Sequence, residues 1–308
     1  MSTPRPLRRR RFLGGLFAVA PAFALARAQA APGARPAFTA TGREFSFDTG
    51  NLRGTLRAGG QSKGLIPVFD TASGAPLARS YGWFSPYRLL DDTTRYGDAA
   101  WSWASTAELQ ADGSVKVNWV ADAGHPFDLE AHYRWSSARG LDFSLRVTAR
   151  RALRRFEVFL ASYFEGFPTT GVQAGSPAGF VGAPRTAGDW QMFPRDEAAV
   201  KIIQDGRWKH PPSPVQWSIR PSFAAPLAIR RDAAKGLAAV LMTRPEECFA
   251  VAAPYDEEVH RSVYFALFGR DLRAAESAAT SARLVVAPRI SDEQAIGRYR
   301  EFLQEVRK

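Results

Sequence analysis

The stretch Leu141-Asp142-Phe143-Ser144-Leu145-Arg146-Val147-Thr148 alternates apolar and polar side chains over its whole length. Because successive side chains of a β-strand point to opposite faces, this period of two places one set against a core and the other set on the opposite face. Residues 127–135 alternate in the same way, and the turn Ala138-Arg139-Gly140 separates the two runs. The sequence therefore predicts a pair of long strands that each bury one face.

Similar strand signals continue through the rest of the chain. They occur at residues 54–58, 64–70, 106–110, 114–120, 156–165, 199–203, 215–220, 226–231, 236–242, 248–252, 261–268 and 279–287. Only the C-terminus has a helical pattern, in which Ser291 and Gln294 form a capping box and an apolar stripe continues to Val306. The expected fold class is all-β, an antiparallel sandwich with one C-terminal helix at residues 291–306.

The first thirty residues have the order of a secretory signal. They contain six arginines and no acid, then an apolar run, then Ala28-Gln29-Ala30 as a cleavage site. Arg9-Arg10-Arg11-Phe12-Leu13 resembles the twin-arginine consensus. A membrane anchor is the alternative, but a spanning helix needs roughly twenty apolar residues and this run has about fifteen. We expect a twin-arginine signal peptide at 1–30, a flexible leader at 31–43 and a single β-sandwich domain at 44–308.

These segments predict where the protein works and which partners it meets. The twin-arginine translocon would carry the chain to the periplasm or the medium, with no membrane span left after cleavage. The formal net charge of +11 falls to +5 without the six arginines of the signal, and no dense basic run remains, so no nucleic-acid partner is expected. The single cysteine, Cys248, excludes an internal disulfide and a cysteine-based metal site, and its apolar neighbours predict a buried position.

A family resemblance adds to this pattern. Gly59-Gly60, the run Gly64-Leu65-Ile66-Pro67-Val68-Phe69-Asp70 and the turn Thr71-Ala72-Ser73-Gly74 resemble the opening of galactose-mutarotase-like sandwiches. Leu272-Arg273-Ala274-Ala275-Glu276-Ser277 resembles their closing turn, with two alanines in place of Pro-Gly. The resemblance implies a large antiparallel two-sheet supersandwich. It also implies sugar chemistry, because such folds serve aldose epimerases and domains of glycoside hydrolases, polysaccharide lyases and periplasmic glucan proteins.

Aromatic residues outside the regular strands indicate where a sugar could bind. A pyranose offers an apolar C–H face for stacking and hydroxyls for hydrogen bonds, and binding pockets combine rings with a few polar groups. Two irregular segments, 166–198 and 205–212, and the run 81–103 bring such residues together. The arginines there would bind substrate, or they would pair with Asp91, Asp92 or Asp98. The predicted substrate-binding residues are Tyr87, Arg88, Trp101, Trp103, Asp189, Trp190, Arg207 and Trp208.

Candidate catalytic groups follow from the same segments. Residues 156–165 have one apolar face and one face that is both aromatic and acidic, with Glu157 and Glu165 at its ends. These two carboxyls lie roughly 26 Å apart at strand rise and cannot act as a pair. Glu165 with Asp196 or Asp189 is the pair that two-carboxylate chemistry would use. Among the four histidines, His210 and His260 are the better candidates, and His210 is preferred because it neighbours Trp208.

The predicted catalytic set is thus Glu165, Asp196 and His210. No cofactor is predicted, since nucleotide-binding, HExxH and Gly-x-Ser-x-Gly motifs are absent from the sequence. No metal is assigned either, because the three aspartates at 91, 92 and 98 fit a surface turn as well as a Ca²⁺ site.

The sequence therefore predicts an exported carbohydrate-active protein that binds a glycan in an aromatic and acidic groove. The enzyme classes considered are a glycoside hydrolase, a lyase or an epimerase. The first alternative is a non-catalytic periplasmic glycan-binding protein. A structural envelope protein whose tryptophans are simply core residues is the second.

Overall fold

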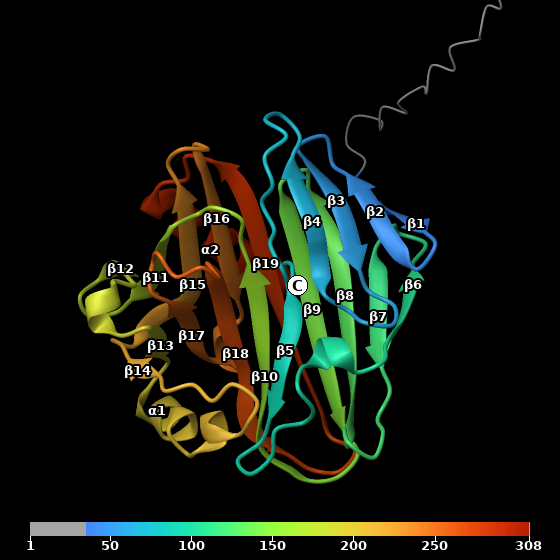
Figure 1. Cartoon of the computed structure of the whole chain (residues 1–308), viewed down its shortest axis with the longest axis vertical. Coiled ribbons are helices and arrows are strands. Elements are labelled where there is room, and N and C mark those ends of the chain that lie inside the picture. The colour runs from blue at the N-terminus through green and yellow to red at the C-terminus, as the bar shows by residue number, and fades with distance from the viewer. Residues whose placement is uncertain (1–34, 308) are drawn as a thin grey trace, which may run out of the picture. The chain divides into compact units, whose positions relative to one another are not determined.

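The computed structural model describes residues 35–307, and the predicted signal peptide at 1–30 lies outside the described residues. Strands dominate this part of the chain and form three sheets (Figure 1). The nine-stranded sheet has the order β12 (Gly179–Gly182), β11 (Thr169–Ala174), β15 (Phe223–Asp232), β16 (Leu237–Thr243), β19 (Ser277–Pro288), β9 (Gly140–Ala149), β8 (Phe127–Ser137), β7 (Val115–Trp119) and β6 (Thr106–Leu109).

The other two sheets are smaller. The six-stranded sheet has the order β14 (Ser218–Ile219), β13 (Trp190–Pro194), β17 (Cys248–Pro254), β18 (Ser262–Leu272), β10 (Leu153–Tyr163) and β5 (Ser85–Leu90). The four-stranded sheet has the order β1 (Phe38–Thr41), β2 (Glu44–Asp48), β3 (Leu52–Arg57) and β4 (Gly64–Asp70). Strand pairs between residues 35 and 307 are antiparallel except for β13 with β14. The α-helices are α1 (Glu197–Ile203) and α2 (Asp292–Val306).

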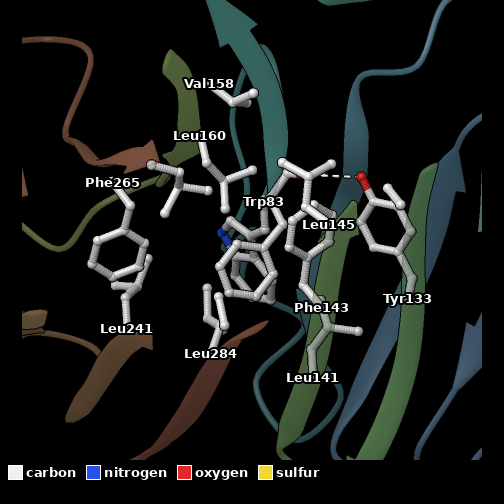
Figure 2. Close-up of a cluster of buried hydrophobic side chains, with 14 of the residues drawn as sticks. Trp83, Tyr133, Leu141, Phe143, Leu145, Val158, Leu160, Leu241, Phe265 and Leu284 are labelled. Atoms are coloured by element: carbon white, nitrogen blue, oxygen red, sulfur yellow. Dashed lines mark hydrogen bonds between the residues drawn. The ribbon is translucent and has the colours of Figure 1, made fainter. Parts of the chain in front are cut away.

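One continuous core lies between the nine-stranded sheet and the two smaller sheets, so the protein is a two-layer sandwich. The alternating stretch at residues 141–148 lies in β9, and its apolar set is buried, including Leu141, Phe143 and Leu145 (Figure 2). Across the sandwich, Leu160 of β10 and Phe265 of β18 belong to the same core. The predicted all-β antiparallel sandwich is confirmed.

A buried phenol ties the layers together at this point. The hydroxyl of Tyr133 on β8 donates a hydrogen bond of 2.6 Å to the backbone carbonyl of Phe84, just before β5 (Figure 2). A buried hydroxyl without a partner costs free energy, so this bond fixes where the two segments meet. The ring of Phe143 packs against both residues, with centroid distances of 5.2 Å to Phe84 and 5.0 Å to Tyr133.

The C-terminal helix is confirmed together with its predicted cap. The Ser291 hydroxyl accepts from the backbone N–H of Gln294, and the Gln294 side chain accepts from the backbone N–H of Ser291. Tyr299 and Phe302 of α2 pack on the outer face of the nine-stranded sheet, against β15 and β16. Within residues 35–307, no helix is long and apolar enough to span a membrane.

Several local predictions differ from the structure. Residues 215–220, predicted as a strand, contribute only the short β14. Residues 38–41 of the predicted flexible leader form β1, because Phe38 is buried against Phe47 and Trp135. Residues 199–203, predicted as a strand, belong to α1, which begins after Asp196 acts as its N-cap. The segment 166–198, predicted as irregular, contains β11, β12 and β13, and of its glycines and prolines only Gly171 lies inside a strand.

We predict that Phe143→Ala lowers the free energy of unfolding by about 3–5 kcal/mol, because it leaves a cavity among rings that cannot close over it. Urea unfolding followed by circular dichroism measures this change. Arg146→Ala is the matched control, since it lies on the exposed face of the same strand and should change stability by less than about 0.5 kcal/mol. Equal losses in both variants would contradict the assigned faces of β9.

Candidate functional site

The outer face of the six-stranded sheet carries a second apolar layer, separate from the main core. β10 presents Phe159, Ala161 and Tyr163 on this face, and Tyr264 of β18 lies opposite Ala161. Ala252 of β17 is the neighbour of Tyr264 on its other side. Because alanines alternate with large rings, the surface has room for a hollow above the small residues.

A cover formed by α1 and the chain that follows it lies over this layer. Trp208, in the 3-10 helix Arg207–Lys209, packs edge-on to Phe159 with ring centroids 4.7 Å apart. Trp217 lies 5.1 Å from Trp208, and Trp190 of β13 lies 6.1 Å from Trp217. Three tryptophans that are distant in the sequence therefore form one wall.

Between sheet and cover lies a cavity of about 280 Å³, which we call the aromatic pocket. Seven of its twelve lining residues are Phe, Tyr or Trp. Among residues 35–307, no aspartate or glutamate lines it. The lining residues are Tyr87, Arg88, Phe159, Tyr163, Trp190, Trp208, Ser213, Pro214, Val215, Trp217, His260 and Tyr264.

Arg88 of β5 forms one end of the aromatic pocket. The register places it opposite Phe159, and its side chain is 3% exposed. Its guanidinium lies 5.2 Å from the ring centroid of Tyr87 and 5.0 Å from that of Trp208, within the range of cation–π attraction. Its Nη2 donates a hydrogen bond of 2.7 Å to the carbonyl of Ser213. The buried cation is thus held by rings and one neutral acceptor.

His260 also lines the aromatic pocket, on the turn before β18. Its ring lies 5.7 Å from Trp190 and 6.2 Å from Tyr163, measured between centroids. Its Nδ1 lies 2.7 Å from a carboxylate oxygen of Glu258, which can only accept, so Nδ1 is the donor. Glu258 also accepts from the backbone N–H of His260. This arrangement fixes the ring and leaves Nε2 free to take or give a proton.

Two tyrosines on the sheet also line the aromatic pocket. The hydroxyls of Tyr264 and Tyr163 are 3.4 Å apart, and both residues are buried. Burial raises the pKa of Tyr264 to about 12, and it raises that of Tyr163 well above its usual value. Both phenols therefore stay protonated near neutral pH, so they can donate hydrogen bonds or a proton but do not serve as bases.

A buried charged cluster supports the tryptophan cover from beneath. Arg207, next to Trp208, donates to Glu157 at 3.0 Å and to both carboxylate oxygens of Asp205. The side chains of Arg207 and Glu157 are fully buried. Removing one partner of such a cluster leaves an uncompensated buried charge. Arg207, predicted to bind substrate, is therefore engaged within the protein and does not line the aromatic pocket.

The structure brings together four of the predicted binding residues, namely Tyr87, Arg88, Trp190 and Trp208. Trp101 lies outside the lining and stacks in parallel on Tyr87, with centroids 4.6 Å apart. Two other predicted binding residues lie elsewhere. Trp103 stacks on His125 beside a different hollow. Asp189 is exposed and pairs with Arg185.

The three predicted catalytic residues do not line the aromatic pocket either. Glu165 pairs with Arg79 at 3.4 Å. Asp196 caps α1 and pairs with Arg195 at 2.8 Å. His210 follows the 3-10 helix as its C-cap. Local partners therefore account for both carboxylates.

Sequence reasoning missed Tyr264, Glu258 and the covering residues 213–215. Tyr264 was hidden inside a strand pattern that is apolar on both faces, which periodicity alone cannot divide. The signal that was present is the short spacing of Glu258 and His260 directly before that strand. A carboxylate and an imidazole two residues apart at a strand end can form a fixed pair.

Comparisons with known proteins bear on the fold of the chain. No protein-family model and no curated protein matches the sequence. Among solved structures, the Slr1438 protein of Synechocystis sp. PCC 6803 matches with a TM-score of 0.50 at 9% identity, covering 82% of this chain and 96% of that one. The chain therefore shares its overall fold with that protein.

Two further structures resemble it. A candidate aldose 1-epimerase of Escherichia coli K12 has a TM-score of 0.45 at 13% identity, covering 82% of this chain and 99% of that one. The α-N-acetylgalactosaminidase NagBb of Bifidobacterium bifidum has a TM-score of 0.48 at 12% identity and covers 87% of this chain, which spans only 39% of that larger protein. At such identities the likeness concerns the fold alone.

We predict that Glu157 makes the protein more stable in mild acid than at neutral pH. Burial raises the pKa of its carboxyl from 4.5 to about 7, although Arg207 opposes the shift. The folded state then binds the proton more tightly than the unfolded state does. The contribution of Glu157 to the free energy of unfolding is therefore largest below about pH 4.5, and it is lost as the pH rises to about 7.

Urea unfolding at several pH values between about 4.5 and 8 measures this dependence. In Glu157→Gln, the part of the slope that belongs to this carboxyl should disappear, whatever the overall loss of stability. Glu165→Gln is the matched control, because this carboxyl lies just after the same strand and is 38% exposed. It should leave the slope as it is. The same slope in the wild type and in Glu157→Gln would contradict the assignment.

Proposed function

We propose that this protein is a carbohydrate-active enzyme that binds a sugar ring in the aromatic pocket and transfers a proton through His260. The observation that carries the proposal is the position of the fixed His260–Glu258 pair at the side of a cavity lined mostly by rings. A pocket lined by rings without a titratable group would favour a protein that only binds the sugar. A histidine without a surrounding cavity would favour a surface role.

The size and chemistry of the pocket support a sugar as the ligand. A volume of about 280 Å³ suits one or two sugar rings more than a polymer segment. Trp190 and Trp217 offer ring faces for the C–H face of a pyranose, while Tyr163 and Tyr264 offer hydroxyls at the sheet. Large flat rings lose little conformational entropy when a ligand covers them, which makes them effective contact surfaces.

The proton-transfer groups favour some of the sugar reactions over others. Two-carboxylate hydrolysis needs two carboxyls on either side of the bond that breaks, and the residues lining this pocket supply none. An imidazole held by Glu258 can accept a proton, and a protonated phenol such as Tyr163 can deliver one. Reactions that remove one proton and return one, in an epimerase or a lyase, fit this set best.

A second candidate function is the non-catalytic glycan-binding protein. The His260 side chain is 46% exposed, whereas the rings that form the pocket lie deeper. A pocket of this kind holds a sugar by stacking whether or not the rim histidine takes part in a reaction. The two candidates therefore share the ligand and differ only in the role of His260.

We predict that a panel of sugars quenches or shifts tryptophan fluorescence, and that His260→Gln lowers turnover of the active substrate by about 100-fold or more while affinity changes only a few fold. Polarimetry detects an epimerase, and ultraviolet absorbance of an unsaturated product detects a lyase. Glu258→Gln should lower kcat less than His260→Gln, because it orients the ring without touching the substrate.

His210→Gln is the matched control for this experiment, with Glu165→Gln and Asp196→Asn beside it, and all three should turn over normally. Sugar binding without any product would favour the binding protein. Unchanged turnover in His260→Gln would remove the catalytic assignment. A panel that leaves the fluorescence of the wild type unchanged would contradict the sugar pocket itself.

We also propose that the protein is exported to the periplasm or the medium through the twin-arginine translocon, as the first thirty residues suggest. Replacing Arg9 and Arg10 by lysine should retain the precursor in the cytoplasm, because that route reads the arginine pair itself. Cell fractionation and immunoblotting measure this outcome. Arg5→Lys with Arg27→Lys is the control of equal charge, and equal export of both double variants would contradict the route.

A further inference from the structure

We propose that Arg88 and Arg95 form the binding site for the carboxylate of an acidic sugar in the aromatic pocket. This inference rests on the proposed function and makes it more specific, because it names the class of sugar. It begins from Arg88, a lining residue of the pocket to which the proton-transfer chemistry gives no role.

Arg88 has donors that the protein does not use. Only its Nη2 is engaged, by the carbonyl of Ser213. Its Nε and Nη1 are buried and have no hydrogen-bond partner among the described residues, which leaves three N–H donors unpaired. Leaving buried donors unsatisfied costs free energy, and most costly of all are those on a charged group. A buried arginine with unpaired donors at a pocket wall is best explained by a ligand that accepts hydrogen bonds from those donors.

The charges around Arg88 are not balanced locally. No carboxylate lines the aromatic pocket among residues 35–307. The buried carboxylate of Glu157 lies in the same region, but it is already paired with Arg207 at 3.0 Å. Arg95 lies outside the pocket lining but close enough to add a second positive charge, because burial and then repulsion from Arg88 lower its pKa. The carboxylate of Asp98 offsets part of this charge at Arg95, and it does not line the pocket either. This end of the pocket therefore attracts an anion.

Both arginines donate to the same short loop of the cover. Nη2 of Arg88 donates to the carbonyl of Ser213, and Nη1 of Arg95 donates to the carbonyl of Pro212. These acceptors are neutral, and hydrogen bonds to a charged acceptor are roughly twice as strong. Residues 211–214 are exposed. A carboxylate can therefore replace these carbonyls by moving a surface loop, without opening the core.

The surroundings favour a carboxylate over a phosphate ester. The faces of the Arg88 guanidinium are next to the rings of Tyr87 and Trp208, which leaves its edge for an acceptor. A flat, singly charged carboxylate fits such an edge, whereas a dianionic phosphate loses much more hydration among rings. The acidic sugar would thus place its carboxylate at Arg88 and its ring against the tryptophans.

The test compares matched ligands on the full-length protein. Isothermal titration and tryptophan fluorescence measure affinity for galactose, galacturonate and galactose 6-phosphate, and for the corresponding glucose series. We expect the uronate to bind at least tenfold more tightly than its neutral parent. Arg88→Gln should remove this preference, so that the uronate and its neutral parent bind with equal affinity, and Arg95→Gln should reduce the preference severalfold.

Arg220→Gln is the matched control. Its guanidinium also lies over a ring, that of Phe193, and its Nε is also buried without a partner, but it does not line the aromatic pocket. It should leave the preference for the uronate unchanged. Arg88→Gln is checked for folding by circular dichroism, and Arg95→Gln provides the test at a half-buried position if Arg88→Gln unfolds.

Each outcome decides between the two proposals. Equal affinity for the uronate and its neutral parent would overturn the carboxylate site and leave the sugar pocket standing. Tightest binding of the 6-phosphate, lost in the arginine variants, would replace the carboxylate by a phosphate. A preference for the uronate that survives in Arg88→Gln and Arg95→Gln would also overturn the assignment. If no sugar binds or changes the tryptophan fluorescence, the proposed sugar-binding function itself is contradicted.

Discussion

The molecule depends on β10 burying both of its faces. Its inward side chains, such as Val158 and Leu160, join the core between the layers, and its outward ones, such as Phe159 and Tyr163, support the aromatic pocket. A strand with one solvent-exposed face could still form the sandwich. No covered pocket could then form on that face. Because one strand carries both packing surfaces, the position of the site is coupled to the stability of the fold.

Charge burial is handled in two different ways on this face. Arg207 is compensated by Glu157 and Asp205, and this cluster holds the tryptophan cover in place at the cost of dehydrating three ions. Arg88 is equally buried but has rings and a backbone carbonyl as neighbours. The first arrangement is complete within the protein. The arrangement around Arg88 is not complete within the protein. This difference distinguishes Arg207, which supports the cover, from Arg88, which suits a ligand.

Sequence patterns predicted a groove that is both aromatic and acidic, and the pocket found among residues 35–307 is aromatic but has no acidic residue in its lining. The aromatic face of residues 156–165 was recognised from its period of two, and Tyr87, Arg88, Trp190 and Trp208 were recognised from rings and charges in irregular segments. The same criterion also selected Trp103, which is buried beside His125. Composition cannot separate these cases, because a tryptophan in a loop looks the same whether it faces a cavity or fills a satellite cluster.

The sequence by itself determined the two-layer β fold, the inward set of β9 and the capped C-terminal helix, because period and capping depend on neighbours a few residues apart. Only the tertiary structure decided which acids are engaged and which histidine faces the pocket. Glu165 and Asp196 meet arginines, while His260 meets Glu258 beside rings from four separate strands. Arg195 and Glu258 are close in the sequence to the residues that they pair with. The approach of Arg79 to Glu165, and of Tyr163 and Trp190 to His260, instead depends on how distant strands and turns pack together, which leaves no local trace in the sequence.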